Sequence, residues 1–185
     1  MSLKRPARPI TAKYLQNAAT FYLERYPSTA EGLRRVLDRR VARAKMADAP
    51  IMENVQQAIA AIVAKFVDAG VIDDKAFAQT KARALHRRGT STRVTRQKLK
   101  LAGIDGETLD KAMAGLDQEL DTDPRQREWK AAMALARRRR LGPYRAKDRK
   151  DHRNRDLATM ARAGFDYALA KKVIDAVDAA ALDEA

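Results

Sequence analysis

Apolar residues recur three and four positions apart along almost the whole chain, which is the spacing of one face of an α-helix. The most regular stripe holds Val55, Ile59, Ile62, Val63 and Phe66. Strong helix formers (Ala, Leu, Arg and Lys) dominate the composition, whereas Gly accounts for only 8 of the 185 residues. These features predict an all-α protein with about nine helices and no sheet.

Glycine, proline and capping residues divide the predicted helices into three groups of three. Ala69-Gly70 closes the third helix, because glycine readily takes the left-handed conformation past a helix end. Pro124 suits the first turn of the seventh helix. The sequence therefore predicts a flexible basic arm over residues 1–10, three-helix repeats over 11–70, 71–120 and 121–180, and a tail over 181–185. Stacked repeats of this kind form an elongated, curved array.

The second and third repeats share a short break with the pattern Ala-Gly-apolar-Asp, at residues 102–105 and 163–166. When the two breaks are aligned, the apolar positions that follow them coincide, which favours a common helical unit. The alternative is that any two amphipathic helices can be placed in register, and the first repeat lacks the break. The coinciding pairs are Leu109 with Ala170, Ala112 with Val173, Met113 with Ile174, and Leu116 with Val177.

Two segments carry signals for the start of a helix. Ser28 to Glu31 has the S-x-x-E pattern of a capping box. Asp73 is a favourable N-cap, and a second acid, Asp74, suits the positive end of the helix dipole.

Aromatic residues are few, at 5% of the chain. Tyr26 and Tyr144 are the candidates for stacking on a nucleic-acid base, which needs an exposed ring. The other rings lie in apolar stripes and are expected in the core: Phe21, Phe66, Phe77, Trp129 and Phe165.

The chain carries 38 Lys and Arg residues against 24 Asp and Glu, a formal net charge of +14. Such an excess indicates a polyanionic partner or an acidic protein surface. Residues 81–100 hold eight basic residues and no acid, and residues 137–155 hold ten with two acids. The alternative is that both stretches are solvated faces of ordinary amphipathic helices. That alternative is weakest for Arg137 to Arg140, because four consecutive residues cover every face of a helix.

Eleven residues from the two basic stretches form the candidate surface for binding this polyanionic or acidic partner. If the stretches line one face, that face would meet phosphates or acidic side chains, and binding should weaken steeply with salt. The candidates are Arg87, Arg88, Arg93, Arg96, Lys98, Lys100, Arg137, Arg138, Arg139, Arg140 and Arg145.

Little in the sequence supports catalysis. Cysteine is absent, and the two histidines, His86 and His152, lack the spacing of a zinc site. No glycine-rich phosphate-binding loop is present. We therefore expect no enzyme activity, no catalytic residue, no metal ion and no cofactor.

No segment predicts export or a membrane span. The longest clean apolar run, 58–64, has seven residues, whereas a transmembrane helix needs roughly 20. The basic N-terminal residues are not followed by the apolar core of a signal peptide. These observations, together with the absence of cysteine, predict a cytoplasmic protein, and we expect a monomer.

Several segments resemble the RecX family in order and spacing. Residues 69–78 match a Gly-x-hydrophobic-Asp-Asp-x-x-Phe-Ala signature, and 97–104 resemble the segment that follows it. Residues 134–144 and 162–167 resemble the third repeat of bacterial members. The resemblance covers about residues 11–177, with two departures: a single glycine, Gly89, replaces a glycine pair, and the loop 141–150 is long.

The resemblance implies a regulator of the RecA recombinase. Proteins of this family lie in or cap the helical groove of the RecA–single-stranded DNA filament, and thereby lower ATPase and strand-exchange activity in DNA repair and recombination, including the SOS response. The implied partners are the RecA filament and single-stranded DNA, with weaker binding to duplex DNA. The alternative is a helical protein that binds DNA directly. The signature itself is interpreted as structural, with Asp73 and Asp74 at a helix start and Phe77 in the core between repeats.

Overall fold

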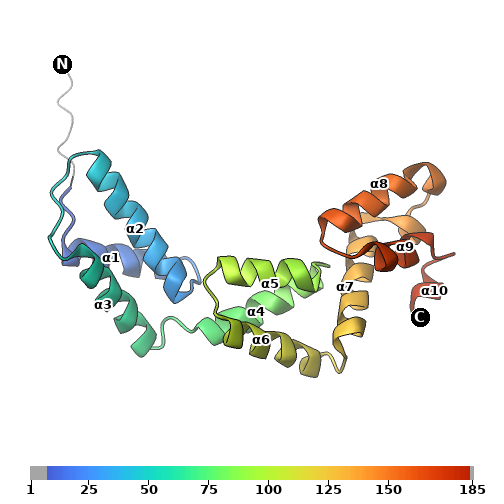
Figure 1. Cartoon of the computed structure of the whole chain (residues 1–185), viewed down its shortest axis with the longest axis horizontal. Coiled ribbons are helices and arrows are strands. Elements are labelled where there is room, and N and C mark those ends of the chain that lie inside the picture. Colours follow the sequence, from blue (N-terminus) through green and yellow to red (C-terminus); the bar gives the residue numbers. More distant parts are fainter. Residues whose placement is uncertain (1–7, 184–185) are drawn as a thin grey trace, which may run out of the picture. The chain divides into compact units, whose positions relative to one another are not determined.

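The computed structural model describes residues 8–183, and within that range it is all-α, as predicted. No strand occurs in the described range, which has one isolated bridge between Ile10 and Ile51. A 3-10 turn, η1 (Gly142–Tyr144), lies between two of the helices (Figure 1). The helices are α1 (Ala12–Leu23), α2 (Ala30–Met46), α3 (Val55–Asp68), α4 (Asp74–Arg87), α5 (Thr92–Leu101), α6 (Gly106–Glu119), α7 (Pro124–Arg139), α8 (Arg149–Arg162), α9 (Tyr167–Asp175) and α10 (Ala180–Asp183).

Contacts among the described residues form two compact units. The first unit runs to Phe77 and also contains Ala102–Ile104, whereas the second holds Ala78–Leu101 and the chain from Asp105 onward. The boundaries predicted for the three repeats and for the basic arm, most of which lies outside the described residues, stay predictions.

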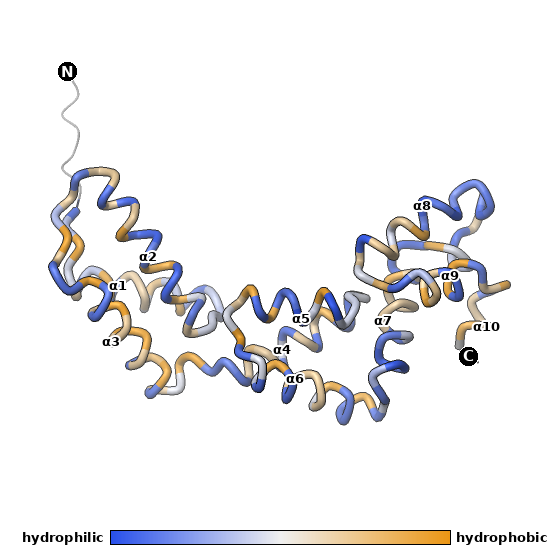
Figure 2. Tube along the Cα trace, in the orientation of Figure 1, coloured by the Kyte–Doolittle hydropathy of each residue, from blue (hydrophilic) through white to orange (hydrophobic). Residues whose placement is uncertain are grey.

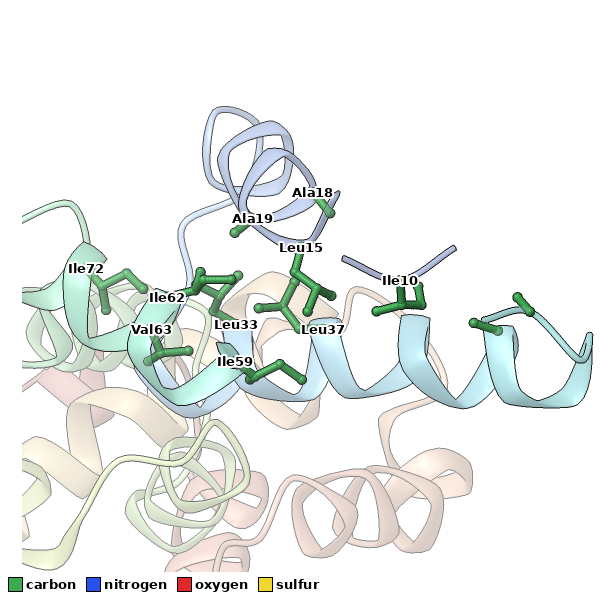
Figure 3. Packing of buried hydrophobic residues seen from close by; sticks show 12 residues of the cluster. Ile10, Leu15, Ala18, Ala19, Leu33, Leu37, Ile59, Ile62, Val63 and Ile72 are labelled. Atoms are coloured by element: carbon green, nitrogen blue, oxygen red, sulfur yellow. The ribbon is translucent and has the colours of Figure 1, made fainter. Parts of the chain in front are cut away.

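The core of the first unit lies among α1, α2 and α3. Leu15 from α1, Leu33 and Leu37 from α2, and Ile59 from α3 are almost completely buried (Figure 3). Ile10 closes this core, because its backbone pairs with the loop before α3: its N–H donates to the Pro50 carbonyl at 2.8 Å. The apolar stripes predicted from the sequence are therefore the buried faces of these helices.

The start of α2 differs from the predicted capping box by one residue. Thr29, rather than Ser28, is the N-cap, and its Oγ1 accepts a hydrogen bond from the Gly32 N–H at 2.9 Å. Glu31 does not close the box but pairs with Arg35 one turn later, at 2.8 Å. The capping-box prediction was wrong because both Ser and Thr can cap and the pattern alone does not choose between adjacent residues.

Residues from later in the chain complete the start of α2. The Thr29 hydroxyl donates to the Ala102 carbonyl, and the Ala30 N–H donates to the Asp74 carboxylate at 3.0 Å. Gly103, with φ +90°, packs against Glu31 so closely that a Cβ on it would lie 2.3 Å from the Glu31 Cβ. The break at 102–105 therefore serves as a contact surface for α2 as well as a turn.

The same arrangement, a helix start completed by an acid and a glycine from later in the chain, recurs at the start of α5 in the second unit. We call this arrangement the joint. Ser91 Oγ accepts the Val94 N–H at 3.3 Å, and the Thr92 N–H donates to Glu128 of α7 at 2.8 Å. Gly164, with φ +95°, packs on Ser91, and a Cβ there would lie 2.4 Å from the Ser91 Oγ. The two Ala-Gly-apolar-Asp breaks thus make equivalent contacts with the second helix of the preceding group.

The helices after the two breaks, α6 and α9, agree with the predicted register of apolar residues except at the end of α9. Asp105 and Asp166 cap α6 and α9, and the aligned apolar residues are buried up to Leu116 and Ile174. Val177 is wrong as a core residue: α9 ends at Asp175, and Val177 is 83% exposed.

Two other expectations for the core need correction. Phe21 is 55% exposed, and its ring lies under the Arg25 guanidinium at 3.6 Å instead of in the core. Phe165 is buried as predicted, whereas Phe66, Phe77 and Trp129 are only partly buried. Residues 181–183 of the predicted tail lie in α10, and Leu182 is buried in the second unit at 2% exposure.

A buried ion pair lies inside the second unit. Arg127 of α7 is 5% exposed and bonds to Asp117 of α6, and the hydroxyl of Thr92 accepts a further hydrogen bond from it at 3.4 Å. His86 of α4 lies beside this pair, and burial together with the positive charge of Arg127 lowers the His86 pKa. The Arg127–Asp117 ion pair therefore lies where residues of α4, α5, α6 and α7 come together.

Candidate nucleic-acid interface

Five cationic side chains gather around one groove in the second unit. The groove has a volume of about 400 Å³ and lies among α5, α7 and α8. Its remaining lining consists of small or uncharged residues, including Thr90, Val94 and Leu135. We call it the cationic groove; its charged residues are Lys98, Arg138, Arg139, Arg155 and Arg162.

The local structure explains why these residues converge. Arg138 and Arg139 stand in the last turn of α7, where positive side chains interact favourably with the negative end of the helix dipole. Arg155 and Arg162 are seven residues apart on α8, so they project from the same face two turns apart. Figure 2 shows the hydrophilic loop before α8 and its hydrophilic first turns.

No acid lines the cationic groove, and within the described residues none of its five cations forms an ion pair. Arg162 makes one side-chain hydrogen bond, donated to the Thr159 hydroxyl at 3.2 Å. All five residues are exposed. Clustered like charges repel one another, and a multivalent anion in the groove would relieve that repulsion. Guanidinium groups offer the forked donors that suit phosphate oxygens.

The eleven residues selected from the sequence divide into three that line the cationic groove and eight that do not. The three are Lys98, Arg138 and Arg139. Arg155 and Arg162 were missed because charge was counted along the chain. The spacing of seven along α8 would have identified them as neighbours on one face.

Two of the other eight candidates are held in ion pairs. Arg96 pairs with Asp110 of α6. Arg145 donates to Asp156 at 2.7 Å, and because Asp156 is only 1% exposed, Arg145 neutralises a buried carboxylate. The Asp156 carboxylate also accepts the Gly142 N–H at 2.9 Å. Arg145 therefore stabilises the turn between α7 and α8, and its hydrogen bond with Asp156 raises the Arg145 pKa.

The remaining candidates are exposed without lining the cationic groove. Arg137 lies 5.9 Å from the centre of the Tyr144 ring, and that ring is partly buried. Arg140 takes a left-handed conformation, φ 53°, at the end of α7. Tyr26, the other ring considered for stacking, is 56% exposed in the first unit. The rest of this exposed set is Arg87, Arg88, Arg93 and Lys100.

The described residues offer neither a metal-binding cluster nor a membrane-spanning helix. No group of three or more His, Asp or Glu side chains is arranged to hold a metal ion in residues 8–183. None of the helices in that range combines the length and the apolar character needed to cross a bilayer.

Comparison with known proteins gives the chain its family. Residues 73–113 match the model described as "RecX, second three-helix domain". The regulatory protein RecX of Myxococcus xanthus is 43% identical over 174 residues, which are 93% of this chain and 89% of the relative. The chain belongs to the RecX family. A second RecX, from Agrobacterium fabrum, is 31% identical over 87% of this chain and 82% of the relative.

Solved structures support the RecX fold independently. The crystal structure of RecX from Lactobacillus salivarius aligns with a TM-score of 0.58, covering 94% of this chain and 97% of that one. A second crystal structure of a regulatory protein RecX aligns with a TM-score of 0.56 over 88% of this chain. Sequence identities of 21% and 19% limit this likeness to the fold.

Proposed function

We propose that this RecX-family protein binds the RecA–single-stranded DNA filament and lowers its ATPase, strand-exchange and recombinase activity. It acts as a regulator, without an enzymatic step of its own. Family membership supports the choice of partner, since the relatives bear the name of a regulatory protein.

The observation that carries the proposal is the cationic groove. A filament of protein on DNA presents phosphates and acidic side chains, and both are ligands for Lys98, Arg138, Arg139, Arg155 and Arg162. The groove has no acid to repel them. The proposal leaves the direct DNA-binding protein as the competing function, because duplex phosphates are ligands of the same kind.

The deciding experiment measures RecA ATPase on single-stranded DNA with this protein added in substoichiometric amounts. We expect inhibition by few copies per filament, because a regulator that caps or occupies the filament acts on many RecA subunits at once. Binding to naked DNA without any effect on the ATPase would support the competing function and overturn the proposal.

Matched variants test the part played by the groove. We expect Arg155→Ala/Arg162→Ala to weaken filament binding about tenfold or more, because each phosphate left without its arginine gives up binding energy and counterion release. Arg87→Ala/Arg88→Ala removes the same charge from residues that do not line the groove and should have a smaller effect. Equal losses from both pairs would show that total charge, and not the groove, determines binding.

A further inference from the structure

A second groove runs along the opposite end of α7 from its arginine cluster. It consists of two cavities of about 560 and 610 Å³ that share Arg125, Leu169 and Lys172. From Pro124 to Met133 of α7 it spans nine residue steps, about 14 Å at 1.5 Å per residue. That length suits a helix of about two to three turns. We call it the α7–α9 groove.

The α7–α9 groove has an apolar floor and a basic rim. Trp129, Met133 and Leu169 lie in the floor. The rim carries Arg125, Lys130 and Lys172, all exposed, and the Lys172 Nζ lies 4.7 Å from the centre of the Trp129 ring. This combination resembles grooves that accept an amphipathic helix, with anchors in the floor and opposite charge along the rim.

Two acids also line the α7–α9 groove, and both are engaged by backbone donors. Glu128 accepts the Thr92 N–H at 2.8 Å, and Asp166 accepts the Leu169 N–H at 2.8 Å. Their charge is therefore partly compensated within the fold. The three rim cations have no acidic partner among the described residues: Lys130 donates to the Leu120 carbonyl at 3.4 Å, and Lys172 lies over the Trp129 ring. The rim favours a negatively charged ligand.

The chain's own C-terminal segment shows what the α7–α9 groove accommodates. Leu182 of α10 fills one end of it at 2% exposure, and the Trp129 Nε1–H donates to the Leu182 carbonyl at 3.3 Å. Residues 173–185 carry four acids and no base. The occupant is thus a short helical turn anchored by a leucine, α10 with the sequence Ala-Ala-Leu-Asp, and its one charged residue is an acid.

The contact made by α10 is small. It is one helical turn, and such a short helix has little stability of its own. The linker before it is anchored separately, because the Arg149 guanidinium donates to the carbonyls of Ile174 and Val177 at 2.8 Å each. Displacement of α10 would therefore begin after Val177 and leave α9 intact.

We propose that the α7–α9 groove is a docking site for an acidic, leucine-containing helical segment of a partner protein, and that α10 competes for it. A partner segment of two to three turns, with a second apolar anchor over Leu169 and Pro124, fills the length of the groove that α10 leaves open. The rim formed by Arg125, Lys130 and Lys172 selects acidic segments.

The test uses a labelled synthetic peptide and the full chain. The peptide is an 11-residue Ala/Glu helix with leucines at its first and eighth positions, and its matched control has Lys in place of Glu. We expect saturable binding of the acidic peptide by anisotropy, about fivefold tighter to Leu182→Asp than to the unaltered chain, because α10 no longer competes. A chain ending at Val177 should bind the acidic peptide as Leu182→Asp does. Because the two variants remove α10 in different ways, a folding defect in one of them would not decide the result.

Trp129 provides a second readout, because it is the only tryptophan in the chain. Its fluorescence should change on peptide binding and on release of α10. In the Leu182→Asp chain, Lys172→Glu should weaken the acidic peptide about tenfold, about 1.4 kcal/mol. Lys171→Glu makes the same change of charge on an exposed neighbour outside the groove and should have a smaller effect.

Three outcomes would overturn the proposal. The first is that neither Leu182→Asp nor the chain ending at Val177 binds the acidic peptide saturably although helicity is intact. The others are equal affinity for the acidic and basic peptides, and equal losses of affinity from Lys172→Glu and Lys171→Glu. None of these measurements involves RecA or DNA, so the result is independent of the filament proposal.

Discussion

The Asp74 carboxylate accepts a hydrogen bond from the Ala30 N–H at 3.0 Å, although the two residues are 44 positions apart. Glu128 does the same for Thr92 at 2.8 Å, 36 positions away. In both cases the first turn of a helix, whose N–H groups have no partner within the helix, is completed by an acid from the helix that opens the next group. Within each unit, an acceptor from later in the chain thus completes the start of a helix that the apolar stripes alone would leave open.

Removal of the Asp74 acceptor should destabilise the first unit. We expect Asp74→Ala to lower the free energy of unfolding by about 1–3 kcal/mol, the range for a hydrogen bond to a charged group. Asp74→Asn keeps an oxygen acceptor and should cost less, although it loses the same charge. Urea unfolding followed by circular dichroism measures both; equal losses would assign the effect to charge near the helix dipole instead.

A side chain at Gly164 should disrupt the equivalent joint in the second unit. Gly164→Ala places a Cβ 2.4 Å from the Ser91 Oγ, at a φ of +95°. The left-handed backbone alone costs about 1–2 kcal/mol for a residue with a Cβ. We expect a larger total loss in thermal or urea unfolding, because Ser91 must also move.

Gly115 supplies the matched control for this substitution. It lies inside α6, and a Cβ there would meet nothing within 4 Å. Gly115→Ala should stabilise the protein by about 0.5–1 kcal/mol through helix propensity. If both substitutions have the same sign, the close packing at Gly164 does not control stability.

The salt dependence of DNA binding should report on the cationic groove. A plot of log affinity for single-stranded DNA against log salt should have a negative slope, to which each phosphate that the protein neutralises adds about 0.7. Arg155→Ala/Arg162→Ala should therefore flatten the slope by about 1.4 if both residues bind phosphates. Fluorescence titrations at several salt concentrations measure it, and an unchanged slope would argue against phosphate binding by these two residues.

His86 should make the second unit less stable in mild acid. Burial and the nearby Arg127 lower its pKa in the folded state. The unfolded chain then binds more protons below the ordinary His pKa of about 6.5, so this contribution to stability is lost as pH falls from 7 toward 5.

His86→Gln should remove that part of the pH dependence. Thermal unfolding of both chains between pH 5 and 8 provides the measurement, with His152→Gln as the control. Parallel curves for His86→Gln and the unaltered chain would assign the acid sensitivity to other groups.

The helices were predictable because their signals are local. Periodic apolar residues such as Ile59 and Ile62 identify a buried face within a few turns, and Asp105 and Asp166 cap helices from their immediate sequence. Phe21 was misjudged because a ring in an apolar stripe is also stable at the surface beneath an arginine, as Arg25 shows.

The cationic groove was only partly predictable because its residues meet through tertiary packing. Lys98 and Arg162 are 64 positions apart, and no local pattern relates α5 to α8. Arg145 was selected for its charge, whereas its role depends on Asp156, a carboxylate whose burial is not apparent from sequence. Charge counts therefore located the basic region but did not separate binding residues from structural ones.

The order of the chain gives the joint at Ala30 a consequence for synthesis on the ribosome. Asp74 leaves the ribosome 44 residues after Ala30, and Ala102 follows still later, so α2 emerges before either of its two backbone partners exists. Glu128 likewise follows Thr92. In the nascent chain, the first turns of α2 and α5 therefore lack these partners until the next group of helices has been synthesised.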